Sequence, residues 1–222
     1  MKQKSGEKTN GFDPNATEKT RRTYQRNSRF YDRMETGAER FFAPWRKQLW
    51  TLVKGTKVLE VGVGTGKNLP YYPDNIEIKA MDLTPGMLER AQQRAQELRK
   101  SVDLCLGDVQ HLDFPDSSFD TVAATFVFCS VPNPVLGLQE IGRVLKPGGR
   151  LLLLEHVRSE KPVLGKVMDW LNPLIVRIMG ANINRRTVEA VRQAGFEIDK
   201  IENLGGEIVK LIIARRPLEP IL

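Results

Sequence analysis

The segment that decides the fold of this chain is Val58-Leu59-Glu60-Val61-Gly62-Val63-Gly64-Thr65-Gly66. Its first half is a short apolar run, which is typical of a buried β-strand. Its second half has three alternating glycines, which permit a tight turn and a close approach of the backbone to a ligand. The N–H groups at the start of the next helix are expected to face that ligand. The segment therefore predicts a strand, a turn and a helix that together form a ligand site.

The spacing of these glycines separates the site from other nucleotide sites. A dinucleotide site follows the pattern G-x-G-x-x-G, which would put the third glycine where Lys67 stands. Here the third glycine comes one residue earlier, at Gly66. The lysine pattern of a P-loop is also absent. An NAD site and an ATP site are both disfavoured for this reason.

Carboxylates stand at the ends of three expected strands, at Glu60, Asp82 and Asp108. The carboxyl ends of parallel strands meet at one edge of an open α/β sheet, where ligands bind. A carboxylate at Asp82 can accept two hydrogen bonds from a ribose diol and would repel a phosphorylated ribose. The alternative is that Asp82 and Asp108 only cap helices or turns. Three carboxylates in equivalent places favour the ligand site.

Strands and helices alternate along most of the chain. This alternation indicates a parallel sheet with helices on both faces. The last two strands, joined by Gly205-Gly206, are expected to form a hairpin that adds an antiparallel strand. The expected strands are 57–61, 76–81, 102–106, 121–128, 150–156, 196–204 and 207–214, and the expected helices between them are 85–100 and 134–145.

The chain is expected to have three parts. Residues 1–16 form a disordered basic tail, residues 17–52 a helical cap in which Gly37 separates two helices, and residues 53–216 the α/β domain. An apolar insertion over 161–182 interrupts this domain.

The composition excludes several classes of protein. Of the 222 residues, 41% are hydrophobic and 27% charged, which suits an ordinary globular core. With two cysteines and two histidines, neither a disulfide framework nor a metal site built by the protein is expected. No apolar run approaches the roughly 18–20 residues of a membrane span, and the N-terminus lacks the apolar core of a signal peptide. We therefore expect a cytoplasmic protein.

The net charge is +7, from 34 basic and 27 acidic residues, and the surplus lies in the two ends of the chain. Basic ends favour contact with nucleic acid or with an anionic membrane surface. The alternative is that they only keep the protein soluble.

Five motifs, in order along the chain, resemble those of the class I S-adenosylmethionine-dependent methyltransferases. The resemblance covers roughly residues 20–216 and is carried by Glu60-Val-Gly-Val-Gly-Thr-Gly66, Asp82, Gly107-Asp108-Val109, Phe119-Asp-Thr-Val122 and Leu145-Lys-Pro-Gly-Gly-Arg150. It implies a Rossmann-like α/β fold, with a seven-stranded sheet in the order 3-2-1-4-5-7-6, strand seven antiparallel, helices on both faces and an N-terminal helical cap.

The same resemblance implies S-adenosyl-L-methionine as cofactor and S-adenosyl-L-homocysteine as product. The residues it places on the methionine part, the ribose and the adenine of the cofactor are Glu60, Gly62, Gly64, Gly66, Asp82, Leu83, Asp108 and Val109. Tyr31 is expected to contact the cofactor as well, because the N-terminal helix of related enzymes folds over it. Thr125, which follows the fourth strand, is expected to contact the cofactor and to line the acceptor side.

Methyl transfer from a sulfonium is a direct displacement, so the protein must align the reactants and exclude water. An amine acceptor must also lose a proton, and His156, at the end of the fifth strand, is the candidate general base. Alternatively, His156 only shapes the pocket. Tyr24 and Tyr31 are candidate catalytic residues that orient an acceptor ammonium by cation–π contact or a phenol hydrogen bond, or they are packing aromatics.

Phe126, Cys129 and Ser130 follow the fourth strand and are expected to line the acceptor side. Trp170 and Arg185 are expected to bind the substrate from the apolar insertion and the segment after it. A nucleophilic role of Cys129 is disfavoured, because direct transfer forms no covalent intermediate. The apolar stretch 163–179, interrupted by Pro173, is expected to cap the pocket, to lie on a membrane interface with the basic N-terminal helix, or to pack in the core.

Within its family, the chain resembles the methyltransferase type 11 branch, which contains quinone C-methyltransferases and bacterial phosphatidylethanolamine N-methyltransferases. Tyr24-x₆-Tyr31-Asp32 is similar to the N-terminal pattern of that branch, and Glu155-His156-Val157 and Gly180-Ala-Asn-Ile-Asn184 resemble the phospholipid enzymes and relatives that methylate thiols. The favoured acceptor is the amine of phosphatidylethanolamine, followed by a quinone precursor and then a small thiol.

The sequence gives less support to two other functional classes. No Asn-Pro-Pro-Tyr-like motif follows the fourth strand, where residues 129–134 read Cys-Ser-Val-Pro-Asn-Pro, so no nucleic-acid partner is expected. An interaction module that binds S-adenosylmethionine without catalysis is disfavoured because all five motifs are intact.

Overall fold

The computed structural model describes residues 11–218, apart from the side chains at 34 and 35. It contains one seven-stranded sheet whose strands lie in the order β3-β2-β1-β4-β5-β7-β6. Strand β7 runs antiparallel to both of its neighbours, and the other pairs are parallel. This order and the C-terminal hairpin confirm the predicted fold. The strands are β1 (Lys57–Val61), β2 (Glu77–Asp82), β3 (Asp103–Leu106), β4 (Phe119–Thr125), β5 (Leu145–His156), β6 (Glu197–Asn203) and β7 (Val209–Arg215).

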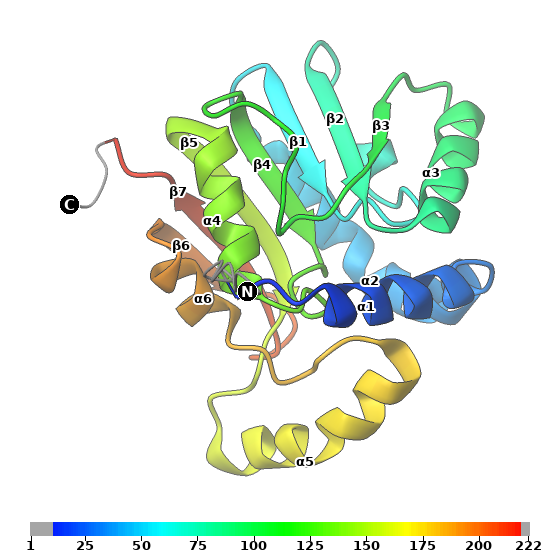
Figure 1. Ribbon diagram of the computed structural model, residues 1–222, viewed down its shortest axis with the longest axis vertical. Coiled ribbons are helices and arrows are strands. Elements are labelled where there is room, and N and C mark those ends of the chain that lie inside the picture. Colours follow the sequence, from blue (N-terminus) through cyan, green and yellow to red (C-terminus); the bar gives the residue numbers. More distant parts are fainter. Residues whose placement is uncertain (1–10, 219–222) are drawn as a thin grey trace, which may run out of the picture.

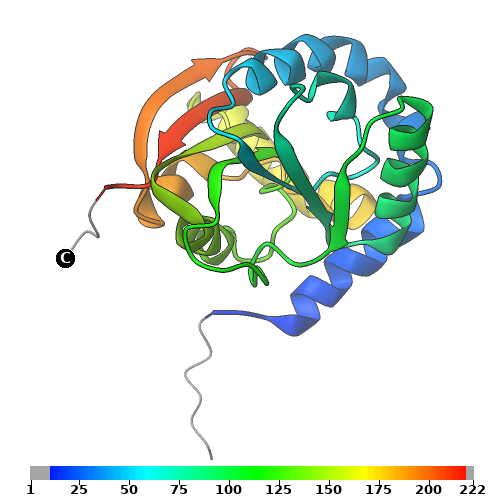
Figure 2. The ribbon, with the colours of Figure 1, turned by 90° about the horizontal axis from the view of Figure 1, so that it is seen from above.

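Helices cover both faces of the sheet (Figures 1 and 2). One core packs under α4 and α6, and the other under α2 and α3. Neighbouring leucines of β5 point alternately into these two cores, Leu151 and Leu153 into the first and Leu152 and Leu154 into the second, as the two-residue period of a strand requires. The helices are α1 (Pro14–Asn27), α2 (Tyr31–Thr51), α3 (Pro85–Glu97), α4 (Pro134–Val144), α5 (Pro162–Met179) and α6 (Thr187–Gln193).

Two helix boundaries near the N-terminus differ from the prediction. The break between the first two helices lies at residues 28–30, and Gly37 lies inside α2. Ser28 ends α1, with its backbone N–H bonded to Tyr24 and its hydroxyl donating to the carbonyl of Gln25. An interior glycine costs a helix only about 1 kcal/mol, so it need not end one. Helix α1 already begins at Pro14, and residues 1–10 of the predicted tail lie outside the described residues.

The helix expected after the glycine-rich turn is reduced to one 3₁₀ turn, η1 (Leu69–Tyr71). One proline explains this difference. Pro73 disfavours the helical conformation of the residue before it, and Tyr72 is extended, with φ −60° and ψ 127°. The backbone of the glycine-rich turn therefore does not run into a long α-helix.

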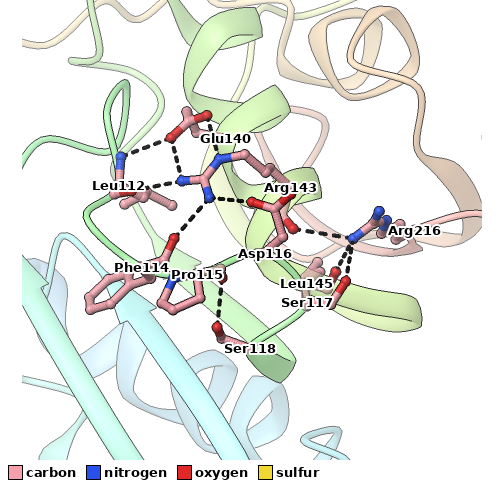
Figure 3. A network of polar contacts seen from close by, with 10 residues as sticks. All are labelled: Leu112, Phe114, Pro115, Asp116, Ser117, Ser118, Glu140, Arg143, Leu145 and Arg216. Atoms are coloured by element: carbon pink, nitrogen blue, oxygen red, sulfur yellow. Dashed lines mark hydrogen bonds and ion pairs between the residues drawn. The ribbon is translucent and has the colours of Figure 1, made fainter.

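An arginine network fastens the long loop between β3 and β4 to the body of the protein (Figure 3). Arg143 of α4 donates to the carbonyls of Leu112 and Phe114, at 2.7 and 2.8 Å, and pairs with Asp116 and Glu140. The loop begins just after β3, where Asp108 stands, so this network supports one wall of the site described below.

Helix α5 stands away from the sheet, below α1 in Figure 1. Only Gly165 and Met168 of its residues are buried. The prediction that this segment is broken at Pro173 is wrong, because Pro173 lies inside a continuous helix of 18 residues. Packing of the segment in the core is also excluded by its exposure. Within residues 11–218, no helix is both long and apolar enough to cross a membrane.

Candidate active site

A cavity opens at the carboxyl ends of β1, β2 and β4, and its empty space, together with the adjoining open solvent, is about 930 Å³. Helix α1 lies across this end of the sheet (Figure 1) and contributes Thr20 and Tyr24 to the cavity wall. The glycine-rich turn, the ends of β2 and β3 and the loop after β4 form the other walls. This is the edge at which the strand-end carboxylates were expected to meet.

Two of the three glycines in the turn line the cavity. A Cβ at Gly62 would lie 2.4 Å from Val127, and one at Gly64 would point into open space. Both residues have a positive φ, of 68° and 56°, which favours glycine. Gly66 is not on the cavity wall, and a Cβ there would lie 2.5 Å from Leu69. Gly66 thus permits close packing against Leu69, and its contact with the cofactor stays a prediction.

Asp82 ties the glycine-rich turn to the end of β2. Its Oδ2 accepts a hydrogen bond from the N–H of Gly64, and its Oδ1 accepts one from the N–H of Thr84, both at 2.9 Å. Burial raises the pKa of the Asp82 carboxyl, and these backbone bonds oppose the shift. Each oxygen keeps a second lone pair, so the carboxylate can also accept from a diol in the cavity. Leu83 lines the same wall, as predicted.

Asp108 and Val109 line the cavity at the end of β3. The carboxylate of Asp108 accepts hydrogen bonds from the backbone and side chain of Gln110, at 2.9 to 3.2 Å. It also accepts a long bond of 3.4 Å from the hydroxyl of Thr17 on α1. Asp108 thus links the cavity wall to the helix that covers it.

Glu60 lies beneath the cavity and is not among the residues that line it, so its direct contact with the cofactor stays a prediction. Its side chain is fully buried and accepts hydrogen bonds from Asn68 and from the phenol of Tyr72. Burial raises the pKa of Glu60 to about 7. Glu60 acts through Asn68, whose amide also donates to Thr125 at 3.0 Å and accepts from Arg46 at 3.1 Å.

The polar residues of the wall that the sequence analysis missed include Arg46, Lys67 and Asn68. The guanidinium of buried Arg46 binds Glu39 and lies 5.4 Å from the ring centre of Phe126. Lys67 lies 3.4 Å from the carboxylate of Glu39 and 5.7 Å from the ring centre of Tyr31. The available signal for Arg46 was its position directly after the aromatic run Phe41-Phe42-Ala43-Pro44-Trp45.

The residues expected on the acceptor side fall into two groups. Tyr24, Tyr31, Thr125, Phe126 and Ser130 line the cavity, as predicted. The rings of Tyr24 and Tyr31 are 6.3 Å apart and tilted by 47°. Residues 126–132, which we call the acceptor loop, follow β4, and Phe126 begins it with a positive φ of 59°.

The remaining predicted residues do not reach the cavity. His156 is not among the lining residues; its ring stacks on Phe126 with centres 4.5 Å apart and meets Phe42 edge-on. This position of His156 does not support the prediction of a general base at the cavity rim. The stack instead supports the orientation of Phe126, which does face the cavity.

Cys129, Arg185 and Trp170 are also absent from the cavity wall. Cys129 is buried, and its thiol donates to the carbonyl of Phe126. Arg185 donates to the carbonyls of Val131 and Cys129, at 2.7 and 3.4 Å, so it supports the acceptor loop from outside. Trp170 is 80% exposed on the outer side of α5. Within residues 11–218, no group of three or more His, Cys, Asp or Glu side chains could hold a metal ion.

Residues 59–153 match a family model described as a methyltransferase domain. Phosphatidylethanolamine N-methyltransferase of Cereibacter sphaeroides is 39% identical over 116 residues, which are 51% of this chain and 57% of that protein. Thiol S-methyltransferase TMT1B of Rattus norvegicus is 31% identical over 79% of this chain and 73% of that protein. Demethylmenaquinone methyltransferase of Lactiplantibacillus plantarum is 33% identical over 68% of each chain.

The chain belongs to the class I S-adenosylmethionine-dependent methyltransferases. A solved structure of geranyl diphosphate C-methyltransferase from Streptomyces coelicolor, in complex with S-adenosyl-L-homocysteine, has the same fold. It matches with a TM-score of 0.68 at 17% identity, over 80% of both chains.

The walls of the cavity suit S-adenosylmethionine, the cofactor of this methyltransferase. Gly64 leaves open space where a Cβ would otherwise enter the cavity. Asp82 offers a fixed carboxylate for the ribose hydroxyls, and Leu83 and Val109 offer apolar surface for the adenine. Arg46 and Lys67 are the cations of the wall, and they suit the carboxylate of the methionine part.

Proposed function

We propose that this methyltransferase transfers methyl groups to the amine of phosphatidylethanolamine at an anionic lipid surface. The observation that carries the proposal is the exposed apolar face of α5. Val163, Val167, Trp170, Leu174 and Ile178 are all exposed there, with Val163 at 77% and Trp170 at 80%. Their spacing of three or four residues places them along one side of the helix. An apolar stripe of this size suits the boundary between lipid headgroups and acyl chains.

The helix that covers the cavity lies next to α5. A Cβ at Gly180, which ends α5, would lie 2.9 Å from Thr23 of α1. Lys19, Arg22 and Arg26 are exposed on α1, and basic residues near a membrane surface each contribute about 1 kcal/mol of attraction to anionic lipids. Apolar and basic surfaces next to the cavity support an acceptor that is itself a lipid.

The two tyrosines favour an amine as the acceptor group. An ammonium group gains about 0.5–2 kcal/mol over an aromatic face, and each methylated product is again a cation. Tyr24 and Tyr31 both face the cavity with tilted rings. We therefore assign them to orienting the headgroup amine. Phe126 and Ser130 complete this side of the cavity.

The reaction requires alignment more than acid–base chemistry. S-adenosylmethionine supplies an activated methyl group when bound, so the acceptor nitrogen attacks it directly. Holding two reactants in line can contribute about 7–11 kcal/mol. The chain provides the covering helix α1, the aromatic rings and the apolar wall that exclude water from this step. An amine in such a surrounding loses its proton more readily than in water.

Two other acceptors are consistent with the relatives, a quinone precursor and a small thiol. The demethylmenaquinone and thiol methyltransferases cover more of this chain than the phosphatidylethanolamine enzyme does. A neutral ring carbon or a thiol gains no cation–π attraction from the tyrosine pair, so the proposal ranks both below the amine.

The test is an assay with labelled S-adenosylmethionine and vesicles of phosphatidylethanolamine and phosphatidylglycerol. Matched vesicles in which phosphatidylcholine replaces phosphatidylethanolamine are the control. We expect label in methylated lipid with the first vesicles only, and vesicle binding that weakens as salt increases. If cofactor binding is confirmed and no lipid is labelled, the amine acceptor is wrong, and a quinone precursor and small thiols are tested next.

A further inference from the structure

The acceptor loop, residues 126–132, is held on two sides by side chains from distant parts of the chain. From the sheet, the fully buried carboxylate of Glu155 accepts the N–H groups of Val127 and Phe128, at 2.8 and 3.0 Å. From outside, the carbonyl of Cys129 accepts two hydrogen bonds from Asn182, through its backbone N–H at 2.8 Å and its side-chain amide at 3.0 Å. Val127 and Ser130, on either side of the pair Phe128-Cys129, line the cavity.

Asn182 is in turn held by α5. Its side-chain oxygen accepts a hydrogen bond of 3.1 Å from the amide of Asn172, and the oxygen of Asn172 accepts the N–H of Ile183 at 2.9 Å. An asparagine side chain has both donors and an acceptor, so Asn182 can bridge the loop and the helix at once. The chain of contacts therefore runs from α5 through Asn172 and Asn182 to the carbonyl of Cys129.

We propose that Asn182 is a positioning residue for the acceptor loop and that Asn172 couples this loop to α5. The proposal rests on the proposed function insofar as α5 is the lipid-facing helix. Asn172 is not on the cavity wall, and its side chain binds Asn182 and Ile183 and not the acceptor loop. It nevertheless holds Asn182, which does bind that loop. When α5 is held at a lipid surface, the acceptor loop is held in the shape that receives the lipid headgroup.

The chain offers a matched control in Asn184. Its side-chain amide donates to Asp169 of α5 at 3.0 Å, so it too joins the segment after α5 to that helix. It lies two residues from Asn182, but its side-chain amide binds α5 and not the acceptor loop. Asn184→Ala should therefore loosen the same segment without loosening the loop.

The deciding experiment compares amide hydrogen exchange over residues 126–132 in the full-length wild type, Asn172→Ala, Asn182→Ala and Asn184→Ala. Loss of one or two hydrogen bonds should speed exchange in the loop by about three- to thirtyfold in the first two variants. The Asn184→Ala variant should match the wild type. Asn172→Ala alone decides the coupling, should Asn182→Ala fail to fold. The proposal is overturned if Asn172→Ala leaves exchange in the loop unchanged, or if all three variants loosen it equally.

Kinetic constants separate positioning from a general loss of stability. Asn172→Ala and Asn182→Ala should raise the KM for the lipid acceptor by a similar factor and leave the Kd of S-adenosylmethionine unchanged. A Kd that rises as much as the KM would show a structural role only. The exchange experiment needs neither lipid nor acceptor, so it can fail while lipid methylation succeeds, or succeed while lipid methylation fails.

Discussion

The cofactor side and the acceptor side of the cavity are built in different ways. On the cofactor side, Gly62 and Gly64 follow β1 and Asp82 ends β2, and the carboxylate of Asp82 accepts a hydrogen bond from the backbone N–H of Gly64. On the acceptor side, α1 is fully described and has no buried residue, and α5 has two. The acceptor loop is held by side chains from β5 and from the segment after α5. The side assigned to the cofactor thus rests on the buried sheet, and the side assigned to the acceptor rests on loosely packed segments.

The largest effect should come from Asp82→Ala on the cofactor side. The substitution removes the carboxylate that fixes the N–H groups of Gly64 and Thr84 and that is assigned to the ribose. Hydrogen bonds to a charged group contribute about 1.5–3 kcal/mol each, so we expect the Kd of S-adenosylmethionine to rise at least about a hundredfold. Calorimetric titration measures this Kd. An unchanged Kd would show that the ribose does not bind at Asp82, and it would contradict the difference described between the two sides.

Glu60 and Glu155 test the same comparison, because both are fully buried, and Glu60 supports the cofactor side whereas Glu155 supports the acceptor side. Burial raises the pKa of both carboxyls to about 7, from an ordinary value near 4.5. The folded protein therefore binds their protons more tightly than the unfolded chain does. The free energy of unfolding should fall as pH rises from about 4.5 to about 7, by up to about 3 kcal/mol for each group.

Denaturant unfolding at several pH values measures this dependence, and Glu60→Gln and Glu155→Gln should each flatten it. We further expect Glu60→Gln to weaken cofactor binding through Asn68. Glu155→Gln should raise the acceptor KM through the amides of Val127 and Phe128. The opposite assignment of the two kinetic effects would contradict the division of the cavity proposed here.

The sequence predicted the cofactor side well because its pattern is local. Strand ends, the glycine spacing and the place of Asp82 follow from short-range rules, and the strand order confirms the predicted sheet. The position of Glu60 beneath the cavity has a local cause as well. Val58 and Glu60 are two residues apart and share one face of β1, so Glu60 points toward the layer of α2 and η1. The two-residue period of a strand could therefore have predicted this position of Glu60 from the sequence.

The acceptor side was predicted less well because its contacts join residues that are far apart in the sequence. The stacking of His156 on Phe126 and the bonds of Arg185 to the acceptor loop have no local signature. The apolar segment was recognised, but its pattern alone did not exclude the core. Its exposure, with Trp170 pointing outward, follows from the position of α5 beside the sheet.

A moderate effect is expected for Trp170→Ala on vesicle binding. Burial of a large aromatic side chain in a lipid interface contributes about 1.5–3 kcal/mol, so binding to vesicles of phosphatidylethanolamine and phosphatidylglycerol should weaken about tenfold or more. Leu106→Ala is the matched control, because Leu106 is 59% exposed on β3, at the other edge of the sheet. Vesicle flotation measures both. Equal loss in the two variants, or none in either, would show that α5 does not bind the lipid surface through Trp170.

The smallest effect is expected at Tyr24, where the side chain can be changed in two steps. Tyr24→Phe keeps the aromatic face and should leave the acceptor KM within about twofold, because a cation–π contact needs the ring and not the hydroxyl. Tyr24→Leu removes the face and should raise this KM about three- to thirtyfold, the range given by about 0.5–2 kcal/mol. Labelled lipid product at varied phosphatidylethanolamine content measures both. If Tyr24→Phe loses as much as Tyr24→Leu, the phenol oxygen orients the amine by a hydrogen bond, and the acceptor side relies on a polar contact in place of the aromatic face.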